Sequence, residues 1–254
     1  MTREGLLVAE VFSAIQGEGA HVGRRQVFLR LAGCNIRCLY CDQPEALELR
    51  PGPCRIEQRA GRRDWSVRSS PLEDNEVVAA VVSLWDQLTH HSISVTGGEP
   101  LMQSERLARI MPALKGPGRR IHLETNGTLG RALARVLPWL DEVSMDLKLP
   151  SVDGEGVGPA AQSAFMAAVV GAGVALSAKI VLGAGTDEAE LVAAVKAVAA
   201  IAPAAGVFLQ PVTPFGAVTE APSPEQVLGW QELALAHHHD VRVIPQTHKQ
   251  IGQL

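Results

Sequence analysis

Three cysteines lie close together near the amino terminus, in the stretch GCNIRCLYCDQ. Cys34, Cys38 and Cys41 have a C-x3-C-x2-C spacing and follow the apolar run 27–31, so a loop after a strand could direct all three thiols at one inorganic centre. A closed zinc site needs four protein ligands, and an electron-transfer 4Fe-4S cluster uses four cysteines. Three thiols with no fourth nearby therefore indicate a 4Fe-4S cluster with one iron left open for chemistry.

Two other roles are compatible with grouped cysteines. A structural zinc site could be completed by Cys54 or by a distant histidine, although zinc ligands usually come as C-x2-C followed by a second pair. A disulfide is a weaker alternative, because Cys38 and Cys41 are too close in sequence to staple a fold and nothing else in the chain is typical of a secreted protein.

The composition favours an α/β protein that acts on a small molecule. Hydrophobic residues make up 46% of the 254 residues and aromatic residues only 4%, so aliphatic side chains must fill the core, which is typical of α/β layers. We expect one domain covering residues 1–254. The formal net charge of -4 provides no general attraction for a polyanion, so nucleic acid is not an expected partner.

The sequence carries no signal for export or for a membrane. The first five residues lack the basic, apolar and small-residue regions of a signal peptide, and no apolar run reaches the ~20 residues of a membrane helix. We therefore expect a cytoplasmic protein with no membrane partner.

Short apolar runs alternate with longer segments of helical periodicity. This alternation predicts a parallel sheet with right-handed crossover connections. The predicted strands cover residues 27–31, 93–96, 121–124, 143–147, 178–182, 207–209 and 241–244, and the predicted helices cover residues 75–88, 104–114, 129–137, 162–172, 187–201 and 224–237.

Polar motifs follow most of the predicted strands. In parallel α/β folds the carboxyl ends of the strands open on one face, and that face holds the site. We therefore expect six motifs to converge on one pocket: the cysteine loop from Cys34, GGEP from Gly97, ETNG from Glu124, DLK from Asp146, QP from Gln210 and QTHK from Gln246.

Two segments stand outside the alternation. Residues 10–19 precede the first predicted strand and carry Gln16 and Glu18 between glycines, which suits a close approach of backbone to a ligand better than a helix. Residues 44–71 are rich in Arg and Pro, and we interpret them as an exposed β-hairpin inserted after the cysteine loop.

The cysteine loop and the following GGEP resemble the radical S-adenosylmethionine (radical SAM) superfamily. Within it, QGEG, RLAGCNIRCLYCD, TGGEP, ETNG, QPV and QTHK together resemble the 7-carboxy-7-deazaguanine synthases of queuosine and 7-deazapurine biosynthesis. The resemblance covers nearly the whole chain except residues 44–71 and the Ala-rich helices. It implies a partial (β/α)6-type radical SAM barrel with a hairpin inserted at 44–71 and with residues 207–254 closing the active site.

The resemblance also implies that SAM chelates the open iron through its amino and carboxylate groups. Gly97 and Gly98 would let backbone approach the methionyl amine, and Glu99 would accept a hydrogen bond from that ammonium. Seen alone, GGEP could instead be a tight turn into a helix.

The remaining SAM contacts are expected at three later strand ends. Glu124, Thr125 and Asn126 would meet the ribose, Lys148 the methionyl carboxylate, and Gln210 the adenine edge. Asp146 belongs to the same predicted site, but it lies on the same strand face as Lys148 and could instead simply pair with it.

The substrate that the resemblance implies is 6-carboxy-5,6,7,8-tetrahydropterin. Its expected contacts are Gln16, Gly17 and Glu18 at the guanidine-like edge, Arg30 and Thr96 on neighbouring strands, and His248 with Lys249 at the carboxylate. Arg30 could instead cover a barrel rim, and His248 could be an ordinary surface residue.

The implied reaction removes hydrogen from pterin carbon C6 with a 5'-deoxyadenosyl radical, contracts the ring, regenerates SAM and releases ammonia. The family also uses Mg2+ near the substrate carboxylate, bound by a Ser or Thr hydroxyl directly after the CD pair. Here that position is Gln43, whose amide oxygen is a longer ligand. Either the metal shifts or the carboxylate is held without it.

Several features have more than one interpretation. The family resemblance suggests a homodimer, and the Arg-rich stretch 55–68 could be a solvated face or could dock an electron donor such as flavodoxin. His90, His91 and the tract 237–239 lie at predicted helix exits, where imidazolium would oppose the helix dipole.

Three alternative functions stay open from the sequence. They are a glycyl-radical activase, another small-molecule radical enzyme, and a non-catalytic iron-sulfur or zinc module.

Overall fold

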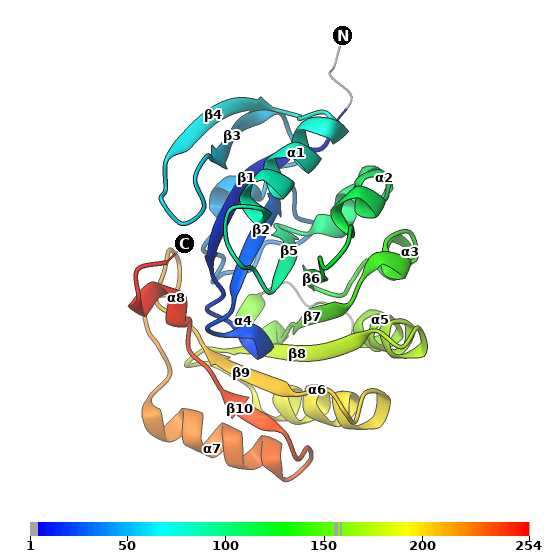
Figure 1. Cartoon of the computed structure of the whole chain (residues 1–254). Helices are drawn as coiled ribbons and strands as arrows, with labels where there is room; N and C mark the ends of the chain where they lie inside the picture. The colour runs from blue at the N-terminus through cyan, green and yellow to red at the C-terminus, as the bar shows by residue number, and fades with distance from the viewer. Residues whose placement is uncertain (1–4, 155–156, 158, 254) are drawn as a thin grey trace.

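A computed structural model describes residues 5–154, 157 and 159–253 as one ten-stranded sheet with helices packed around it (Figure 1). Residues 1–4, which fall in the segment predicted to lack a signal peptide, lie outside the described residues. The strand order is β10-β9-β8-β7-β6-β5-β2-β1-β3-β4. The parallel strands are β2 (Arg25–Leu31), β5 (Ser92–Gly97), β6 (Ile121–Thr125), β7 (Glu142–Leu147), β8 (Ala175–Leu182), β9 (Val207–Pro211) and β10 (Val241–Val243). The predicted α/β architecture is confirmed.

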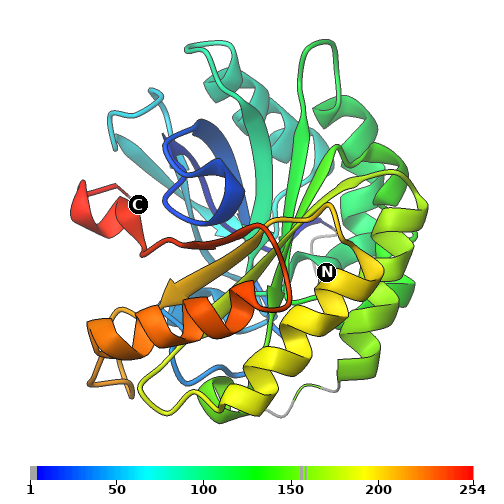
Figure 2. The same cartoon turned by 90° about the horizontal axis from the view of Figure 1, so that it is seen from below.

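The helices form an outer layer around the sheet when the molecule is viewed from below (Figure 2). The longer ones are α1 (Asp74–Trp85), α2 (Ser104–Leu114), α5 (Pro159–Gly171), α6 (Glu188–Ile201) and α7 (Pro224–Leu235). Side-chain caps define where several begin. Asp187 accepts hydrogen bonds from two backbone N–H groups of α6, and Ser223 forms a capping box with Gln226 at the start of α7.

Aliphatic side chains fill the space between the sheet and these helices. Val95, Leu123 and Ile180 of the central strands are fully buried, as are Leu107 of α2 and Val195 of α6. They belong to one continuous apolar cluster that extends from β3 to α7. Burial of such side chains is the main stabilising contribution to a sheet covered by helices.

The segment before the first predicted strand is itself largely a strand, which the sequence interpretation missed. β1 (Val8–Ile15) pairs antiparallel with β2. Its run VAEVFSAI does not read as an apolar run because Glu10 and Ser13 interrupt it, yet both are buried with partners. Glu10 forms ion pairs with Arg30 and Arg55, and the backbone N–H of Ser13 donates to Glu57.

The predicted hairpin within residues 44–71 is present and extends the main sheet. β3 (Gly52–Glu57) pairs antiparallel with β4 (Trp65–Ser70), and β3 also pairs in parallel with β1. Cys54 and Ile56 are therefore buried, so the hairpin is exposed on one side only.

Short helical turns occupy several connections. The predicted helix at 129–137 is too long: α3 covers only Gly130–Leu133 and a 3-10 turn follows at Leu137–Trp139. Pro138 lies in this 3-10 turn and has no backbone N–H, so it cannot donate the hydrogen bond that would continue an α-helix through the predicted end of the segment. The other short elements are α4 (Pro150–Asp153), α8 (Thr247–Gln250) and the 3-10 turns η1 (Gly19–His21), η2 (Pro44–Ala46) and η3 (Pro100–Gln103). No helix among the described residues is long and apolar enough to span a membrane.

Candidate active site

A cavity is lined by residues at the carboxyl ends of the parallel strands and by the segment 16–21 at their amino ends, and all but three of the residues predicted for the site line it. From the predicted metal and SAM sites the lining includes Cys34, Cys38, Cys41, Gln43, Gly97, Gly98, Glu124, Thr125, Asn126, Asp146, Lys148 and Gln210, and from the predicted substrate site it includes Gln16, Glu18, Arg30, Thr96 and His248. The three exceptions are Gly17, Glu99 and Lys249. Segments separated by more than 200 residues of sequence therefore meet at one site.

The three clustered cysteines form part of one wall of this cavity as half-buried free thiols. Burial raises the pKa of Cys38 to about 11, although the nearby Lys148 partly opposes the shift. The thiol would thus stay protonated unless a cationic centre stabilised its thiolate, as cluster iron does. Cys54 is fully buried in the apolar core and cannot serve as a fourth ligand. The thiol set fits a cluster with one open iron.

The two glycines of GGEP allow the end of β5 to approach the cysteine loop. A Cβ atom on Gly98 would lie 2.4 Å from the carbonyl oxygen of Gly33 and 2.8 Å from Cβ of Cys34. Gly97 has a φ of 149°, and a Cβ there would lie 2.1 Å from the oxygen of Leu31. Both positions therefore require glycine for contact between protein segments as well as for access to a ligand.

Glu99 does not line the cavity, and its predicted contact with the SAM ammonium stays a prediction. Its carboxylate is fully buried and accepts hydrogen bonds from N of Leu101 (3.0 Å), Oγ1 of Thr125 (2.9 Å) and N of Asn126 (2.8 Å). Burial raises the pKa of Glu99 to about 7, against these stabilising donors. Glu99 therefore positions the ETNG strand end from behind the cavity wall.

Asn126 connects this strand end to the cysteine loop. Its Nδ2 donates to Oδ1 of Asn35 at 3.0 Å, and Nδ2 of Asn35 donates to Oγ1 of Thr128 at 2.9 Å. Asn35 lies between the first and second cysteines, so the hydrogen bonds fix the loop that would hold the cluster. GGEP, ETNG and the cysteine loop form one connected polar network.

The predicted rival pairing of Lys148 with Asp146 is present. Nζ of Lys148 lies 2.9 Å from Oδ2 of Asp146 and donates to the hydroxyl of Tyr40 at 2.9 Å, and Lys179 lies 3.3 Å from the same carboxylate oxygen. Burial alone would raise the pKa of Asp146, but Lys148 and Lys179 more than offset it and the pKa is lowered. Asp146 thus pairs with two lysines at the cavity wall, and the lysines hold it ionised.

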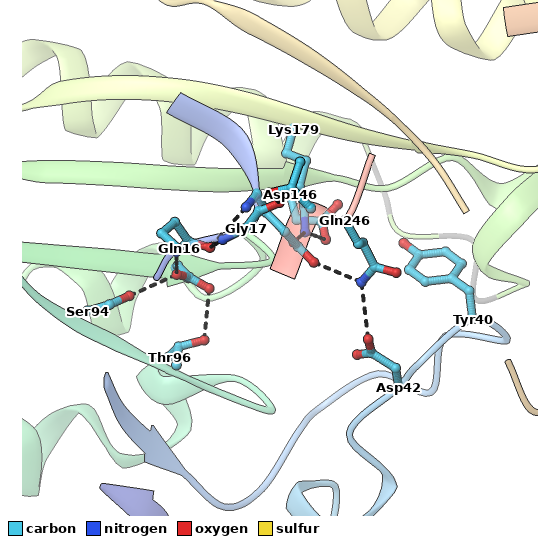
Figure 3. Close-up of polar contacts among 12 residues, drawn as sticks. Gln16, Gly17, Tyr40, Asp42, Ser94, Thr96, Asp146, Lys179 and Gln246 are labelled. Carbon is cyan, nitrogen blue, oxygen red and sulfur yellow. Dashed lines mark hydrogen bonds and ion pairs between the residues drawn. The ribbon is translucent and has the colours of Figure 1, made fainter. Parts of the chain in front are cut away.

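Glu124 lies on the cavity lining among hydroxyl and amide donors, and its partners Gln16, Ser94 and Thr96 are labelled in Figure 3. Oε1 accepts from Nε2 of Gln16 at 2.7 Å and from Oγ of Ser94 at 2.8 Å, while Oε2 accepts from Oγ1 of Thr96 at 3.0 Å. Burial opposes ionisation, but His122 and these donors lower the pKa of Glu124. The carboxylate is therefore a fixed anionic acceptor. It contacts Gln16 of the predicted substrate site, and its predicted contact with the SAM ribose stays a prediction.

Glu18 and the carboxyl-terminal segment meet beside this acceptor. Nε2 of Gln246 donates to Oε1 of Glu18 at 2.8 Å and to Oδ2 of Asp42 at 3.1 Å (Figure 3). Lys179 pairs with Oε2 of Glu18 at 2.6 Å, and Lys249 pairs with Asp42 at 2.8 Å. Lys249 is thus paired with Asp42 and does not line the cavity, and its contact with the substrate carboxylate stays a prediction.

Gly17 permits the close contact between QGEG and QTHK. The backbone N–H of Thr247 donates to the oxygen of Gly17 at 3.0 Å, and a Cβ on Gly17 would lie within 2.5 Å of three atoms of His248. Gly17 therefore acts through chain packing and does not line the cavity. His248 lines the cavity, and burial lowers its pKa, which favours a neutral imidazole.

Three further polar residues line the cavity and differ in whether their side chains already have hydrogen-bond partners. They are Arg30, Gln210 and Gln43. Nε of Arg30 donates to Oε2 of Glu10 at 3.1 Å, and the guanidinium stacks 5.5 Å from the ring centre of Phe12. Oε1 of Gln210 is buried and has no hydrogen-bond partner among the described residues, so it can accept from a ligand. Gln43 follows Asp42 on the cavity lining, at the position where a hydroxyl residue was expected.

Sequence reasoning gave no individual role to five residues that organise the site, namely Tyr40, Asp42, Ser94, Lys179 and Gln246, although Gln246 begins a motif expected to reach the pocket. Tyr40 and Asp42 lie inside the cysteine loop, and Gln246 begins the QTHK motif. Their positions within predicted motifs were therefore the signal that could have identified them. Lys179 carried its own signal, because a lysine inside the predicted strand 178–182 is costly to bury unless it is paired.

Comparison with known proteins identifies the class to which this site belongs. Residues 29–160 match the Radical SAM superfamily. QueE from Escherichia coli has the same fold, with a TM-score of 0.59 at 18% identity over 96% of this chain and 94% of that one. A radical SAM methyltransferase from Sphaerobacter thermophilus also shares it, with a TM-score of 0.60 at 19% identity over 88% of this chain and 70% of that one. The fold and the three cysteines define a radical SAM enzyme, a class whose cofactors are a 4Fe-4S cluster and SAM.

Sequence similarity identifies the family more closely. The chain is 39% identical to a 7-carboxy-7-deazaguanine synthase from Geobacter sulfurreducens over 259 residues, which cover 100% of both chains. It is 40% identical to a 7-carboxy-7-deazaguanine synthase from Thermococcus kodakarensis over 149 residues, or 56% of this chain and 58% of that relative. The chain belongs to the 7-carboxy-7-deazaguanine synthase family.

Proposed function

We propose that the protein converts 6-carboxy-5,6,7,8-tetrahydropterin to 7-carboxy-7-deazaguanine with release of ammonia. The observation that carries this proposal is one cavity lined both by the three cysteines and by the fixed acceptor Glu124. When bound, the cluster and SAM supply a 5'-deoxyadenosyl radical that removes hydrogen from carbon C6 of the pterin. The residues of the chain bind both molecules next to each other and exclude water.

The SAM end is the part of the cavity nearest the cysteines. Backbone groups of Gly97 and Gly98 approach the cysteine loop and would meet the methionyl amine without interference from side chains. Lys148 would attract the methionyl carboxylate while Asp146 and Tyr40 keep its ammonium in place. The unpartnered Oε1 of Gln210 would accept a hydrogen bond from the adenine amino group.

The pterin end presents both carboxylate acceptors and a lysine cation. The guanidine-like edge of the pterin donates hydrogen bonds, and Glu124 with Glu18 supplies carboxylate acceptors for it. Lys179 lies between Glu18 and Asp146 and supplies a cation for the carboxylate at C6, with His248 as a further donor. Two carboxylates already pair with Lys179, so the substrate competes with them and enters a site whose charges are balanced.

The same charge pattern bears on the role of Mg2+. Asp42, next to Gln43, already pairs with Lys249, and its Oδ2 also accepts from Gln246. A hard cation near Gln43 would have to displace these donors or rely on one amide oxygen. We propose that lysine contacts hold the substrate carboxylate and that Mg2+ contributes little to turnover in this protein.

Anaerobic turnover tests the proposal. Reconstituted enzyme, SAM, a low-potential reductant and 6-carboxy-5,6,7,8-tetrahydropterin should yield 7-carboxy-7-deazaguanine, identified by mass and absorbance. A Cys38→Ala variant serves as the control for cluster dependence. SAM cleavage without this product would instead favour a different radical substrate, and the absence of an iron-sulfur spectrum that responds to SAM would favour a non-catalytic module. Homodimerisation, reduction by a flavodoxin and a cytoplasmic location stay predictions.

A further inference from the structure

Two histidines and a glutamate form a compact group outside the cysteine site. His21, His91 and Glu142 each offer one ligand atom, and these atoms all lie within 4.8 Å of one another. None of the three is needed for the proposed contacts with SAM or the pterin. His21 lines the cavity, whereas His91 and Glu142 do not.

The topology places this group at the amino ends of the parallel strands. Glu142 begins β7, and His91 directly precedes β5. β1 and β2 are antiparallel and Ile15 pairs with Arg25, so their connection, which carries η1 and His21, lies at the amino end of β2. The 16–24 segment therefore lies at the amino ends of the parallel strands. His21 brings this segment close to the starts of β5 and β7.

Surrounding groups fix the orientation of two of the potential ligands. Nδ1 of His91 lies 3.0 Å from Oγ of Ser92, and Nε2 of Gln26 donates to the same hydroxyl at 2.7 Å. Nη2 of Arg120 donates to Oε1 of Glu142 at 2.6 Å, and Oε2 of Glu142 contacts Nε2 of His21. Metal-binding imidazoles and carboxylates are typically held by such outer hydrogen bonds.

A separate observation concerns His21 itself. Its Nδ1 is buried and has no hydrogen-bond partner among the described residues. The rings of His91 and His122 each lie with their centres 4.8 Å from that of His21, so the imidazole is enclosed by other imidazoles. A buried polar atom normally has a hydrogen-bond partner, and this nitrogen has none although two other imidazoles surround its ring.

We propose that His21, His91 and Glu142 bind a divalent transition-metal ion, with Zn2+ as the best-suited occupant. Two imidazole nitrogens and one carboxylate oxygen are a known donor set for zinc, with Zn–N distances of about 2.0–2.1 Å. Ligand atoms spread over 4.8 Å need only small side-chain rotations to reach one ion. The bound ion would fasten the 16–24 segment to β5 and β7 and so hold Gln16 and Glu18 beneath the substrate.

Cobalt binding to the untagged holoenzyme, with its cluster already reconstituted, tests the site. One equivalent of Co2+ should give visible d–d absorption, and excess Zn2+ should abolish it. His91→Gln and Glu142→Gln should eliminate the absorption, while Ser92→Ala should weaken binding by about 10–100-fold because it frees the His91 ring. His239→Gln, an exposed histidine in the 237–239 tract, is the matched control and should bind cobalt normally.

A second measurement does not depend on whether a variant folds. X-ray absorption at the zinc edge of the zinc-loaded wild-type holoenzyme reports which atoms surround the ion. Two imidazole ligands with oxygen and no sulfur support the proposal. Sulfur neighbours would place the zinc at the cysteines and overturn it. The proposal is equally overturned if the wild type binds no stoichiometric cobalt, or if His91→Gln binds cobalt as well as His239→Gln does. The three residues would then only connect the 16–24 segment to the sheet through an ion pair.

Discussion

Replacement of Gly98 by alanine should disable the site through a contact between two protein segments. The added Cβ would lie 2.4 Å from the oxygen of Gly33 and 2.8 Å from Cβ of Cys34. Ordinary van der Waals contact requires about 1 Å more than the shorter of these distances. Because Gly98 has no positive φ, the effect of the substitution is purely steric.

The displaced group is the loop that carries the first cysteine. Overpacking of this kind typically costs about 1–3 kcal/mol of folding stability. A shift of about 1 Å between reacting partners can lower a rate by about 100-fold. Gly98→Ala should therefore fold with reduced stability, incorporate less iron, and cleave SAM about 100-fold more slowly per cluster.

Gly130→Ala is the matched control, because Gly130 is exposed and a Cβ there would have no neighbour within 4 Å. Iron content, the single-turnover rate of SAM cleavage and the denaturation midpoint should be measured for both variants and the wild type. The reasoning is refuted if Gly98→Ala matches Gly130→Ala in iron content and in rate.

Three further substitutions, at Glu99, Gln16 and Gln43, should each change a different measured property. Because burial raises the pKa of Glu99 to about 7, its protonated form stabilises the fold fully below about pH 4.5, and that contribution is lost as the pH rises through 7. Glu99→Gln should remove up to about 3 kcal/mol of this pH dependence in denaturation at about pH 5–8, whereas the exposed Glu105→Gln should leave the slope unchanged. Gln16→Ala removes a donor to Glu124 and should raise KM for the pterin by about 10-fold; an unchanged KM would remove Gln16 from the substrate site. Gln43→Ser supplies the hydroxyl expected for Mg2+ and should make turnover more dependent on Mg2+ than in the wild type, as measured with and without a chelator.

The parallel sheet and its cavity could be predicted because each depends on local patterns. Apolar runs such as 93–96 and 121–124 are buried on both faces, and their carboxyl ends carry the motifs that meet in the cavity. The strand β1 could not be recognised in the same way. Its Glu10 and Ser13 are stabilised by Arg30, Arg55 and Glu57, which are contacts between distant segments that no local pattern reveals.

The roles of individual site residues were harder to predict than their location. Glu99 lies in the right motif, but its carboxylate turns away from the cavity to satisfy three buried donors. Lys249 lies in QTHK, yet Asp42 takes up its charge. A motif places a side chain near a site, whereas the direction in which it points depends on which partners the fold brings to it.

Transfer of the C6 hydrogen is the most direct test of the central claim, that one cavity brings the cluster, SAM and the pterin together. The enzyme should be incubated with 6-carboxy-5,6,7,8-tetrahydropterin deuterated at C6, and the SAM and 5'-deoxyadenosine pools analysed by mass spectrometry. We expect deuterium to enter these pools as 7-carboxy-7-deazaguanine forms. Product without deuterium in either pool, or 5'-deoxyadenosine that forms at the same rate with and without the pterin, would contradict the account.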